Sequence, residues 1–172
     1  MTVPQLETIT KRFPRLSSII AYGSAVFPQS TTPSSDSLTD LMFVVRDARQ
    51  WHLDNISMNP SDYSQLARRV LGANGVAMVQ EWPGGMWFNA GCVVGGVLCK
   101  YGVVSAGRAV DDLVNWRDFT FAGRLQKPIL CVSTDSSDDI MELNVRVNRP
   151  SALLHSLSPY IHNKQQSVTW NS

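Results

Sequence analysis

Several common signatures are missing from this chain of 172 residues. Its three cysteines form no Cys-x-x-Cys pair, and its three histidines lie at no zinc-type spacing from them, which argues against a zinc site. No stretch approaches the roughly 18 consecutive apolar residues that cross a bilayer, so we expect any membrane contact to be peripheral. The formal net charge of +1 provides no basic field for nucleic acid, and we expect no nucleic-acid partner.

The composition is that of a globular domain with a core. Hydrophobic residues make up 44% of the chain and charged residues 17%, and the length suits one domain or little more. Cys92, Cys99 and Cys131 lie in apolar contexts, which favours reduced, buried thiols in a reducing compartment. No feature of the sequence indicates an oligomeric state.

The first 18 residues allow two interpretations. Three basic residues and one acidic residue make them faintly similar to a targeting segment. Leu6, Ile9 and Phe13, however, recur at helical spacing and lead directly into an apolar strand. We therefore expect the first helix of the domain here, which leaves little room for a cleavable presequence.

The hydrophobic pattern predicts an α/β (or α+β) fold, a sheet with helices on at least one face. Asp47 is the expected N-cap of the second helix. Leu66 and Val70 are expected on one face of the third helix, which Gly72 and Gly75 should end. Helices are predicted over residues 5–13, 47–55, 62–71 and 109–116, and strands over residues 16–21, 41–45 and 129–132, with a hairpin turning at Gly95-Gly96 between residues 93–94 and 97–104.

Two short segments bear the clearest chemical signal. Gly23-Ser24 follows an apolar strand and forms a turn without bulky side chains, where backbone N–H groups and a small hydroxyl can approach a phosphate. Asp40 opens the next strand, where its carboxylate can hold Mg²⁺. A phosphate cradle beside such a carboxylate is the minimal apparatus for transferring a nucleotidyl group. Both features also occur as ordinary turn residues.

Several longer strings follow, in order, the pattern of one family. The two most unusual are Lys100-Tyr101-Gly102-Val103-Val104-Ser105 and Ala122-Gly123-Arg124-Leu125-Gln126-Lys127-Pro128. Shorter matches lie at residues 22–27, 40–45, 51–55, 62–64, 87–89 and 112–116. Together these strings resemble the mitochondrial phosphatidate cytidylyltransferases from about residue 20 to about residue 132.

The resemblance implies a fold, a reaction and a location. The fold is a nucleotidyltransferase-like mixed sheet flanked by helices, and the reaction converts CTP and phosphatidic acid into CDP-diacylglycerol and pyrophosphate for cardiolipin synthesis. Mg²⁺ is the implied cofactor, and the implied location is peripheral, on the matrix side of the inner mitochondrial membrane. Family members continue into a helical C-terminal domain. We therefore expect a catalytic domain over residues 1–140 and, over residues 141–172, a partly disordered remnant of the entry to that missing domain.

The resemblance also implies roles for the residues around the first turn. Gly23 and Ser24, with Tyr22 beside them, would bind the CTP phosphates, and Asp40 would hold Mg²⁺. Lys100 would bind the triphosphate or the phosphatidate headgroup. The expected catalytic residues are Ser24, Asp40 and Lys100.

Two further features bear on the anion and metal sites. Arg124 and Lys127 lie three residues apart and, in a helix, would form a two-point anion clamp. The nucleotidyltransferase superfamily, to which the resembled family belongs, usually has a second carboxylate two positions after the metal-binding Asp. In this chain Met42 occupies that position. Carboxylates two apart on a strand share a face, so this replacement should weaken the metal site or shift ligation to Asp36 or a triphosphate oxygen.

Four more residues are expected to contact substrate: His52, Asn55, Tyr63 and Asn89. His52 and Tyr63 each have a structural alternative as a packed side chain. Two others are expected to be structural. Asp112 should lie in the first turn of a helix, where a carboxylate favours the macrodipole, and Trp116 should lie in the core.

Two other functions stay open at this point. The chain could transfer a nucleotide to another substrate, or it could be a non-enzymatic mitochondrial assembly or scaffold protein on a decayed nucleotidyltransferase fold, which Met42 would suit. The absence of a Ser-His-Asp or Cys-His arrangement is consistent with the cytidylyltransferase, because the attacking phosphate is already anionic and needs no strong general base.

Overall fold

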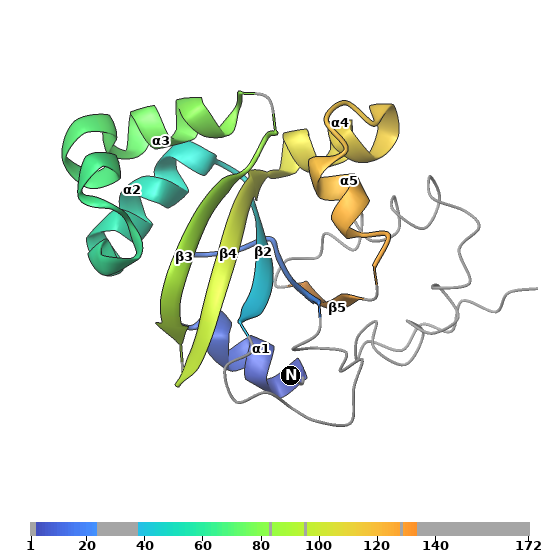
Figure 1. The fold of residues 1–172 in the computed structure, drawn as a ribbon, viewed down its shortest axis with the longest axis horizontal. Helices are drawn as coiled ribbons and strands as arrows, with labels where there is room; N and C mark the ends of the chain where they lie inside the picture. Colours follow the sequence, from blue (N-terminus) through green and yellow to red (C-terminus); the bar gives the residue numbers. More distant parts are fainter. Residues whose placement is uncertain (1–2, 24–37, 83, 95, 128, 134–172) are drawn as a thin grey trace, which may run out of the picture.

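A five-stranded mixed sheet organises the fold of the computed structural model (Figure 1). The structure describes residues 3–23, 38–82, 84–94, 96–127 and 129–133. The strands are β1 (Ser18–Tyr22), β2 (Thr39–Val45), β3 (Trp87–Val94), β4 (Val97–Ser105) and β5 (Ile129–Ser133). Across the sheet they lie in the order β3-β4-β2-β1-β5.

Helices cover both faces of this sheet (Figure 1). One face carries α1 (Val3–Thr10), α2 (Ala48–Met58) and α3 (Gly72–Gln80), and the other carries α4 (Ala106–Asn115) and α5 (Thr120–Arg124). A 3₁₀ helix, η1 (Pro60–Asp62), and a π-helical segment, η2 (Ala67–Leu71), lie between α2 and α3. The predicted α/β fold with a mixed sheet is confirmed. Among the described residues, no helix is long and apolar enough to cross a membrane.

The pairing of the strands explains why the sheet is mixed. β1 runs antiparallel to β2 and β5, whereas β2 and β4 are parallel. β3 and β4 form the predicted antiparallel hairpin, in which Val94 pairs with Val97. The parallel pair requires a crossover from one end of the sheet to the other, and α2, α3 and β3 supply it.

Alternation along the central strand divides the interior into two cores. Leu41 and Phe43 of β2 pack with α1 and α2, whereas Met42 and Val44 pack with α4 and α5. The first core holds a cluster of aromatic rings, with the Phe43 and Tyr101 ring centroids 4.8 Å apart. Since residues two apart on a strand share a face, Asp40 belongs to the face of Met42.

The third helix differs from the prediction for residues 62–71. The backbone N–H of Ala67, the first residue of η2, donates to the Ser64 hydroxyl oxygen over 3.1 Å. Helical structure then continues through η2 and α3 to Gln80. Gly72 is the C-cap of η2, with φ +58°, so the predicted end at Leu71 is confirmed for this segment. α3 follows without a loop, and Gly75 lies inside it, because glycine weakens a helix without forbidding one. The face with Leu66 and Val70 is exposed; these side chains are 63% and 71% accessible.

The capping predictions had mixed outcomes. Asp47 is the N-cap of α2, since its carboxylate accepts a hydrogen bond from the Gln50 N–H over 2.9 Å. The N-cap of α4, Ser105, was not predicted. The helix begins at Ala106, three residues before the start of the predicted helix over residues 109–116. Trp116 was wrongly predicted to be buried. It is the left-handed C-cap of α4, and 52% of it is exposed.

The remaining expectations concern residues that the structure does not describe. The boundary at residue 140 and the segment over residues 141–172 lie outside the described residues, so the division into domains stays a prediction.

Candidate functional site

Three residues predicted to act together lie side by side across the sheet. Tyr22, the last residue of β1, pairs with Asp40 of β2, and Asp40 pairs in turn with Lys100 of β4. Neighbouring strands lie about 4.8 Å apart, so the three backbones fall on one line across β1, β2 and β4. The register thus brings together residues that are up to 78 positions apart in the sequence.

The turn after β1 leaves space beside the Asp40 carboxylate. Gly23 has φ +86°, a left-handed conformation that favours glycine. A Cβ atom placed on Gly23 would lie 3.5 Å from Asp40 Oδ2, so glycine leaves this position open to a ligand. Ser24, the predicted hydroxyl donor and catalytic residue, lies outside the described residues.

Two cations share one aromatic ring near this line. The Nζ atom of Lys100 lies 4.7 Å from the centroid of the Phe88 ring, and the Cζ atom of Arg124 lies 5.1 Å from the same centroid. Arg124 Nε also donates to the Tyr22 hydroxyl over 3.3 Å. Burial raises the pKa of Tyr22 and outweighs this hydrogen bond. Through these contacts, residues of β1, β3, β4 and α5 form one positively charged cluster.

Lys127 does not join Arg124 on a helix. α5 ends at Arg124, and the Lys127 N–H donates to the Arg124 carbonyl oxygen over 3.2 Å, which closes a turn. The physical reason is Pro128, because a proline disfavours helical backbone at the residue before it. The predicted helical clamp is therefore wrong, and the exposed Lys127 as a substrate contact stays a prediction.

Asp112 fixes the turn that carries α5. It lies in the second half of α4 rather than in its first turn, because the helix begins at Ala106. Burial raises its pKa, but four backbone N–H donors lower it by more, and the pKa lies below its ordinary value. These donors, at 2.7 to 3.0 Å, belong to Asp118, Phe119, Phe121 and Ala122.

His52, Asn55 and Tyr63 are on the opposite face of the sheet, inside a buried network. His52 is fully buried; its Nδ1 atom accepts from the Tyr63 hydroxyl over 2.7 Å, and its Nε2 atom donates to Gln80 Oε1 over 2.8 Å. Burial lowers the pKa of His52 to about 4, so the ring is neutral. Both ring nitrogens are occupied, which corresponds to the structural alternative for this residue.

The network continues to a partly buried ion pair between Arg12 and Asp62 that sequence reasoning missed. Asn55 Nδ2 donates to the hydroxyls of Tyr63 and Tyr101, and Tyr101 donates to Asp62 Oδ2 over 2.9 Å. Asp62 Oδ1 lies 2.6 Å from Arg12 Nη2. A tyrosine inside an apolar strand was the available signal, since a buried Tyr hydroxyl needs a partner.

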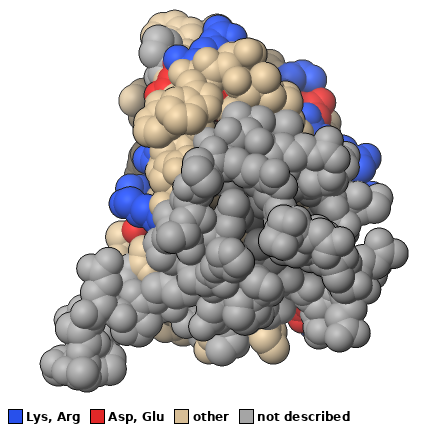
Figure 2. All heavy atoms as spheres, turned by 90° about the vertical axis from the view of Figure 1, so that its right-hand side faces the viewer, with Lys and Arg blue, Asp and Glu red and all other residues tan. Residues whose placement is uncertain are grey.

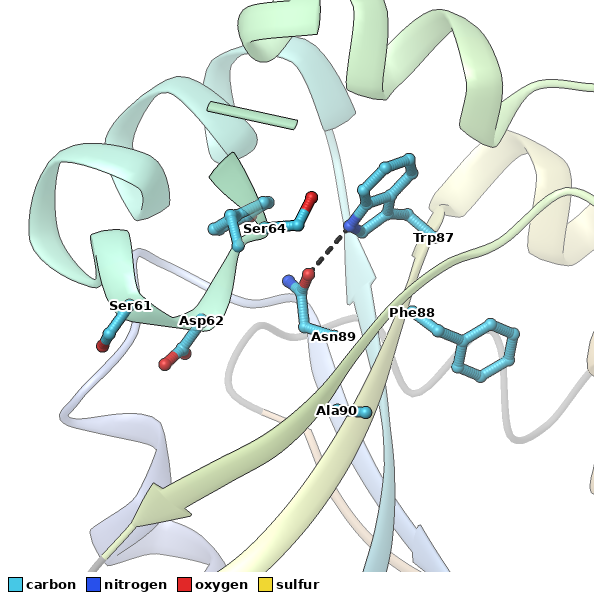
Figure 3. Close-up of a pocket in the computed structure, with 8 residues that line it drawn as sticks. Ser61, Asp62, Ser64, Trp87, Phe88, Asn89 and Ala90 are labelled. Carbon is cyan, nitrogen blue, oxygen red and sulfur yellow. Dashed lines mark hydrogen bonds between the residues drawn. The ribbon is translucent and has the colours of Figure 1, made fainter. Parts of the chain in front are cut away.

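Asn89 lies beside a hollow on this same side of the sheet. Figure 3 shows Asn89 and Trp87 pointing toward η1, while Phe88 points the other way. The hollow has a volume of about 350 Å³, and Trp87 Nε1 donates to Asn89 Oδ1 over 2.9 Å at its wall. Its other lining residues are Ser61, Asp62, Tyr63, Ser64, Phe88 and Ala90. The predicted substrate contacts thus divide into two groups, one on each face.

Met42 shares the Asp40 face of β2 but belongs to the core. Its side chain is fully buried and packs in the second core, so the position two residues after Asp40 serves packing. Within the described ranges, no three His, Cys, Asp or Glu side chains gather as a set of metal ligands. Asp36, the alternative ligand, lies outside these ranges.

Comparison with known proteins identifies the family. The family profile described as "Phosphatidate cytidylyltransferase, mitochondrial" matches residues 6–165. The chain belongs to this family. Relatives with the same printed name include proteins of Rattus norvegicus, 40% identical over 136 residues, and of Dictyostelium discoideum, 33% identical over 175 residues. The phosphatidate cytidylyltransferase resemblance is thereby confirmed.

The chain is shorter than these phosphatidate cytidylyltransferases. The rat alignment covers 77% of this chain and 40% of the relative, and the Dictyostelium alignment covers 91% and 40%. The alignment with a relative from Caenorhabditis elegans, 35% identical over 158 residues, covers 91% of this chain and 46% of the relative. The chain therefore spans about two fifths of the length of the curated relatives that it matches.

The described surface on the α4 and α5 side carries charges of both signs. Figure 2 shows Lys and Arg atoms at several separate places on this visible surface, with Asp and Glu atoms among them. This distribution agrees with the net charge of +1. The described surface therefore offers no broad basic field that would attract anions to this side of the molecule.

Proposed function

We propose that this chain carries the nucleotidyl-transfer site of a phosphatidate cytidylyltransferase, which makes CDP-diacylglycerol and pyrophosphate from CTP and phosphatidate. The observation that carries the proposal is the juxtaposition of Asp40 and Lys100 on paired strands, beside the open turn at Gly23. Membership of the family supports it. A phosphate cradle, a carboxylate and a cation are the three components that this transfer requires.

The phosphates of CTP would occupy the open side of the turn after β1. Backbone N–H groups at Gly23, together with the Ser24 hydroxyl, would donate to phosphate oxygens. Lys100 and Arg124 would lie against the same charge from β4 and α5. Lys100 and Arg124 already lie together against the Phe88 ring, and such preorganisation favours charge stabilisation during the reaction.

Asp40 would hold Mg²⁺, and the residues present fit that ion. Mg²⁺ is commonly bound through one or two carboxylates together with substrate phosphates, so one carboxylate with an open side is sufficient. The space that Gly23 leaves beside Asp40 Oδ2 is suitable for such ligation. When bound, Mg²⁺ supplies charge neutralisation for the triphosphate.

The transfer itself needs no proton acceptor. A phosphate oxygen of phosphatidate attacks the α-phosphorus of CTP, a new P–O bond forms, and the bond to the bridging oxygen of the β-phosphate breaks. Pyrophosphate leaves with that oxygen and its electron pair. The role of Lys100 and Arg124 is to hold the triphosphate in line and to balance the charge that collects on the leaving group.

The proposed location follows the relatives' printed names. They are described as mitochondrial. We infer the same organelle for this chain, in peripheral contact with the matrix side of the inner membrane, where its lipid substrate would be presented.

Paired variants test the function. Asp40→Asn should reduce Mg²⁺-dependent formation of labelled CDP-diacylglycerol from CTP and phosphatidate vesicles by about 100-fold or more, because a metal-bound charge is lost. Asp54→Asn is the matched control, since this carboxylate lies on α2 and accepts from Gln50. Equal turnover by the wild type and Asp40→Asn would refute the assignment. Calorimetry without CTP binding would favour the non-enzymatic alternative.

A further inference from the structure

The Phe88 ring has an unusual position between two positive charges. Lys100 approaches it from the neighbouring strand and Arg124 from α5, at 4.7 and 5.1 Å from the ring centroid. Both distances lie within the roughly 6 Å at which an aromatic face attracts a cation. We call Phe88, Lys100 and Arg124 the cation bracket.

The backbone explains why the ring can lie there. Phe88 of β3 pairs directly with Gly102 of β4. A Cβ atom on Gly102 would lie 2.8 Å from Phe88 Cε1, which is closer than real Cβ contacts. Gly102 therefore provides the room in which the ring lies against the strand that carries Lys100.

A bulge in β3 lies opposite Lys100. The register passes from Asn89–Tyr101 to Cys92–Cys99, so two residues of β3 face the single residue Lys100. Gly91, one of the two, has φ +74°. Such bulges bend the strand and change where nearby side chains point, and here the bulge separates Lys100 from a direct pair on β3.

The charges of the bracket are not balanced within the described part of the chain. No described carboxylate forms an ion pair with Lys100 or Arg124. Two positive side chains on one ring repel each other, and the ring compensates only part of that repulsion. An anion with several charges is the ligand that would complete the arrangement.

We propose that Phe88 is a positioning residue for the triphosphate. Its ring holds Lys100, and it orients Arg124 together with the Tyr22 hydroxyl and the Thr120 carbonyl oxygen, so that both cations engage one polyphosphate chain. Without the ring, Lys100 would turn toward water and Arg124 would lose one of its contacts. The inference rests on the proposed function for the identity of the nucleotide. The bracket itself requires only a polyphosphate, which allows the two proposals to fail separately.

Binding measurements with the intact chain test this role. Phe88→Leu should weaken the binding of CTP with Mg²⁺, and of inorganic tripolyphosphate, by about fivefold, while Phe88→Trp should restore wild-type affinity to within about twofold. In the lipid assay the KM for CTP should rise more than kcat falls. Trp82→Leu, which removes an exposed aromatic ring at the end of α3, is the control.

The possible outcomes separate the bracket from the overall function. Wild-type affinity for both ligands in folded Phe88→Leu would overturn the proposal, even if the chain makes CDP-diacylglycerol. Loss of tripolyphosphate binding in Phe88→Leu would support it, even if the chain makes no such product. If Phe88→Leu does not fold, Gly102→Ala provides the second test, because the added Cβ atom would displace the Phe88 ring, together with the Met86 side chain that lies even closer, while keeping the ring. Unchanged binding in that variant would also overturn the proposal.

Discussion

The two faces of the sheet contain polar side chains in opposite situations. On the α1 and α2 face, His52, Asn55 and Asp62 are buried and bonded to one another or to neighbouring side chains. On the α4 and α5 face, the charges of Lys100 and Arg124 meet an aromatic ring and no described carboxylate. The first group finds its partners within the protein, although Arg12 Nη1, Gln80 Nε2 and Asn89 Nδ2 on the same face have no hydrogen-bond partner among the described residues. The second group has hydrogen-bond acceptors for Arg124 but no ion-pair partner for either charge among the described residues.

This difference shows how to separate structural from functional polar residues. A buried polar group must find a partner within the protein, and when it does, its removal mainly affects stability. A partly exposed cation beside an open turn has no such requirement, and its removal mainly affects binding. The predictions below test this division, from the largest expected effect to the smallest.

The partly buried ion pair should carry the largest effect on stability. Asp62→Ala leaves the Arg12 guanidinium and the Tyr101 hydroxyl without their acceptor, so unfolding free energy should fall by about 3 kcal/mol. Denaturant unfolding measures this. Asp54→Ala, on the exposed side of α2, should change stability by less than about 0.5 kcal/mol. If both variants lowered the unfolding free energy equally, the structural role assigned to the Arg12–Asp62 pair would be wrong.

His52 should make stability depend on pH. Its pKa falls from 6.5 to about 4 because burial disfavours the charged ring. Between these values the unfolded chain binds more protons than the folded one. The stabilisation from neutral His52 is therefore complete above about pH 6.5 and is lost as the pH falls toward 4. The total loss in unfolding free energy approaches roughly 3 kcal/mol. Denaturant midpoints across this range should show a steeper slope in the wild type than in His52→Gln. Identical slopes would contradict the prediction.

Arg124 should affect binding rather than stability. Arg124→Ala removes one cation of the bracket, and CTP affinity measured by calorimetry should fall about tenfold, as for a charge-assisted contact. The control is Arg117→Ala, which removes an exposed guanidinium paired with Asp111 and should leave affinity unchanged. A marked loss of thermal stability in Arg124→Ala, with CTP affinity unchanged, would show that Arg124 has a structural role.

Leu66 should show the smallest effect. Its side chain is 63% exposed, so Leu66→Ser should change unfolding free energy by less than about 0.5 kcal/mol. Val76→Ala on α3, at a fully buried position, should lower it by about 1.5 kcal/mol. Denaturant unfolding of both variants distinguishes the faces of this helix. A loss above about 1 kcal/mol in Leu66→Ser would contradict the exposed position.

Local patterns allowed most elements and part of the site to be predicted. The hairpin at Gly95-Gly96, the cap at Asp47 and the strand that ends at Tyr22 each depend on a few consecutive residues. Glycine at position 23 follows the same logic, because a left-handed turn favours glycine at a single position. Gly72 ends the segment η2 as predicted, with φ +58°, but the next helix, α3, was missed, since packing of its buried face outweighs the low helix propensity of Gly75.

Long-range placement could not be predicted from these patterns. His52 and Lys100 belong to equally suggestive strings, yet the sheet places one in a sealed network and the other beside an open turn. Phe88 and Asp112 gave no chemical signal, because an aromatic residue in a strand and a carboxylate in a helix are common. Their importance arises only from the partners that the fold brings to them.

The sequence by itself determined the family, the α/β class and the open turn beside a strand, because these depend on the order and spacing of residues along the chain. Only the tertiary structure decided which polar residues satisfy one another and which face a ligand. The strand register and the face of each side chain set those distances, and electrostatic and hydrogen-bond energies depend on distance in space rather than on separation in sequence.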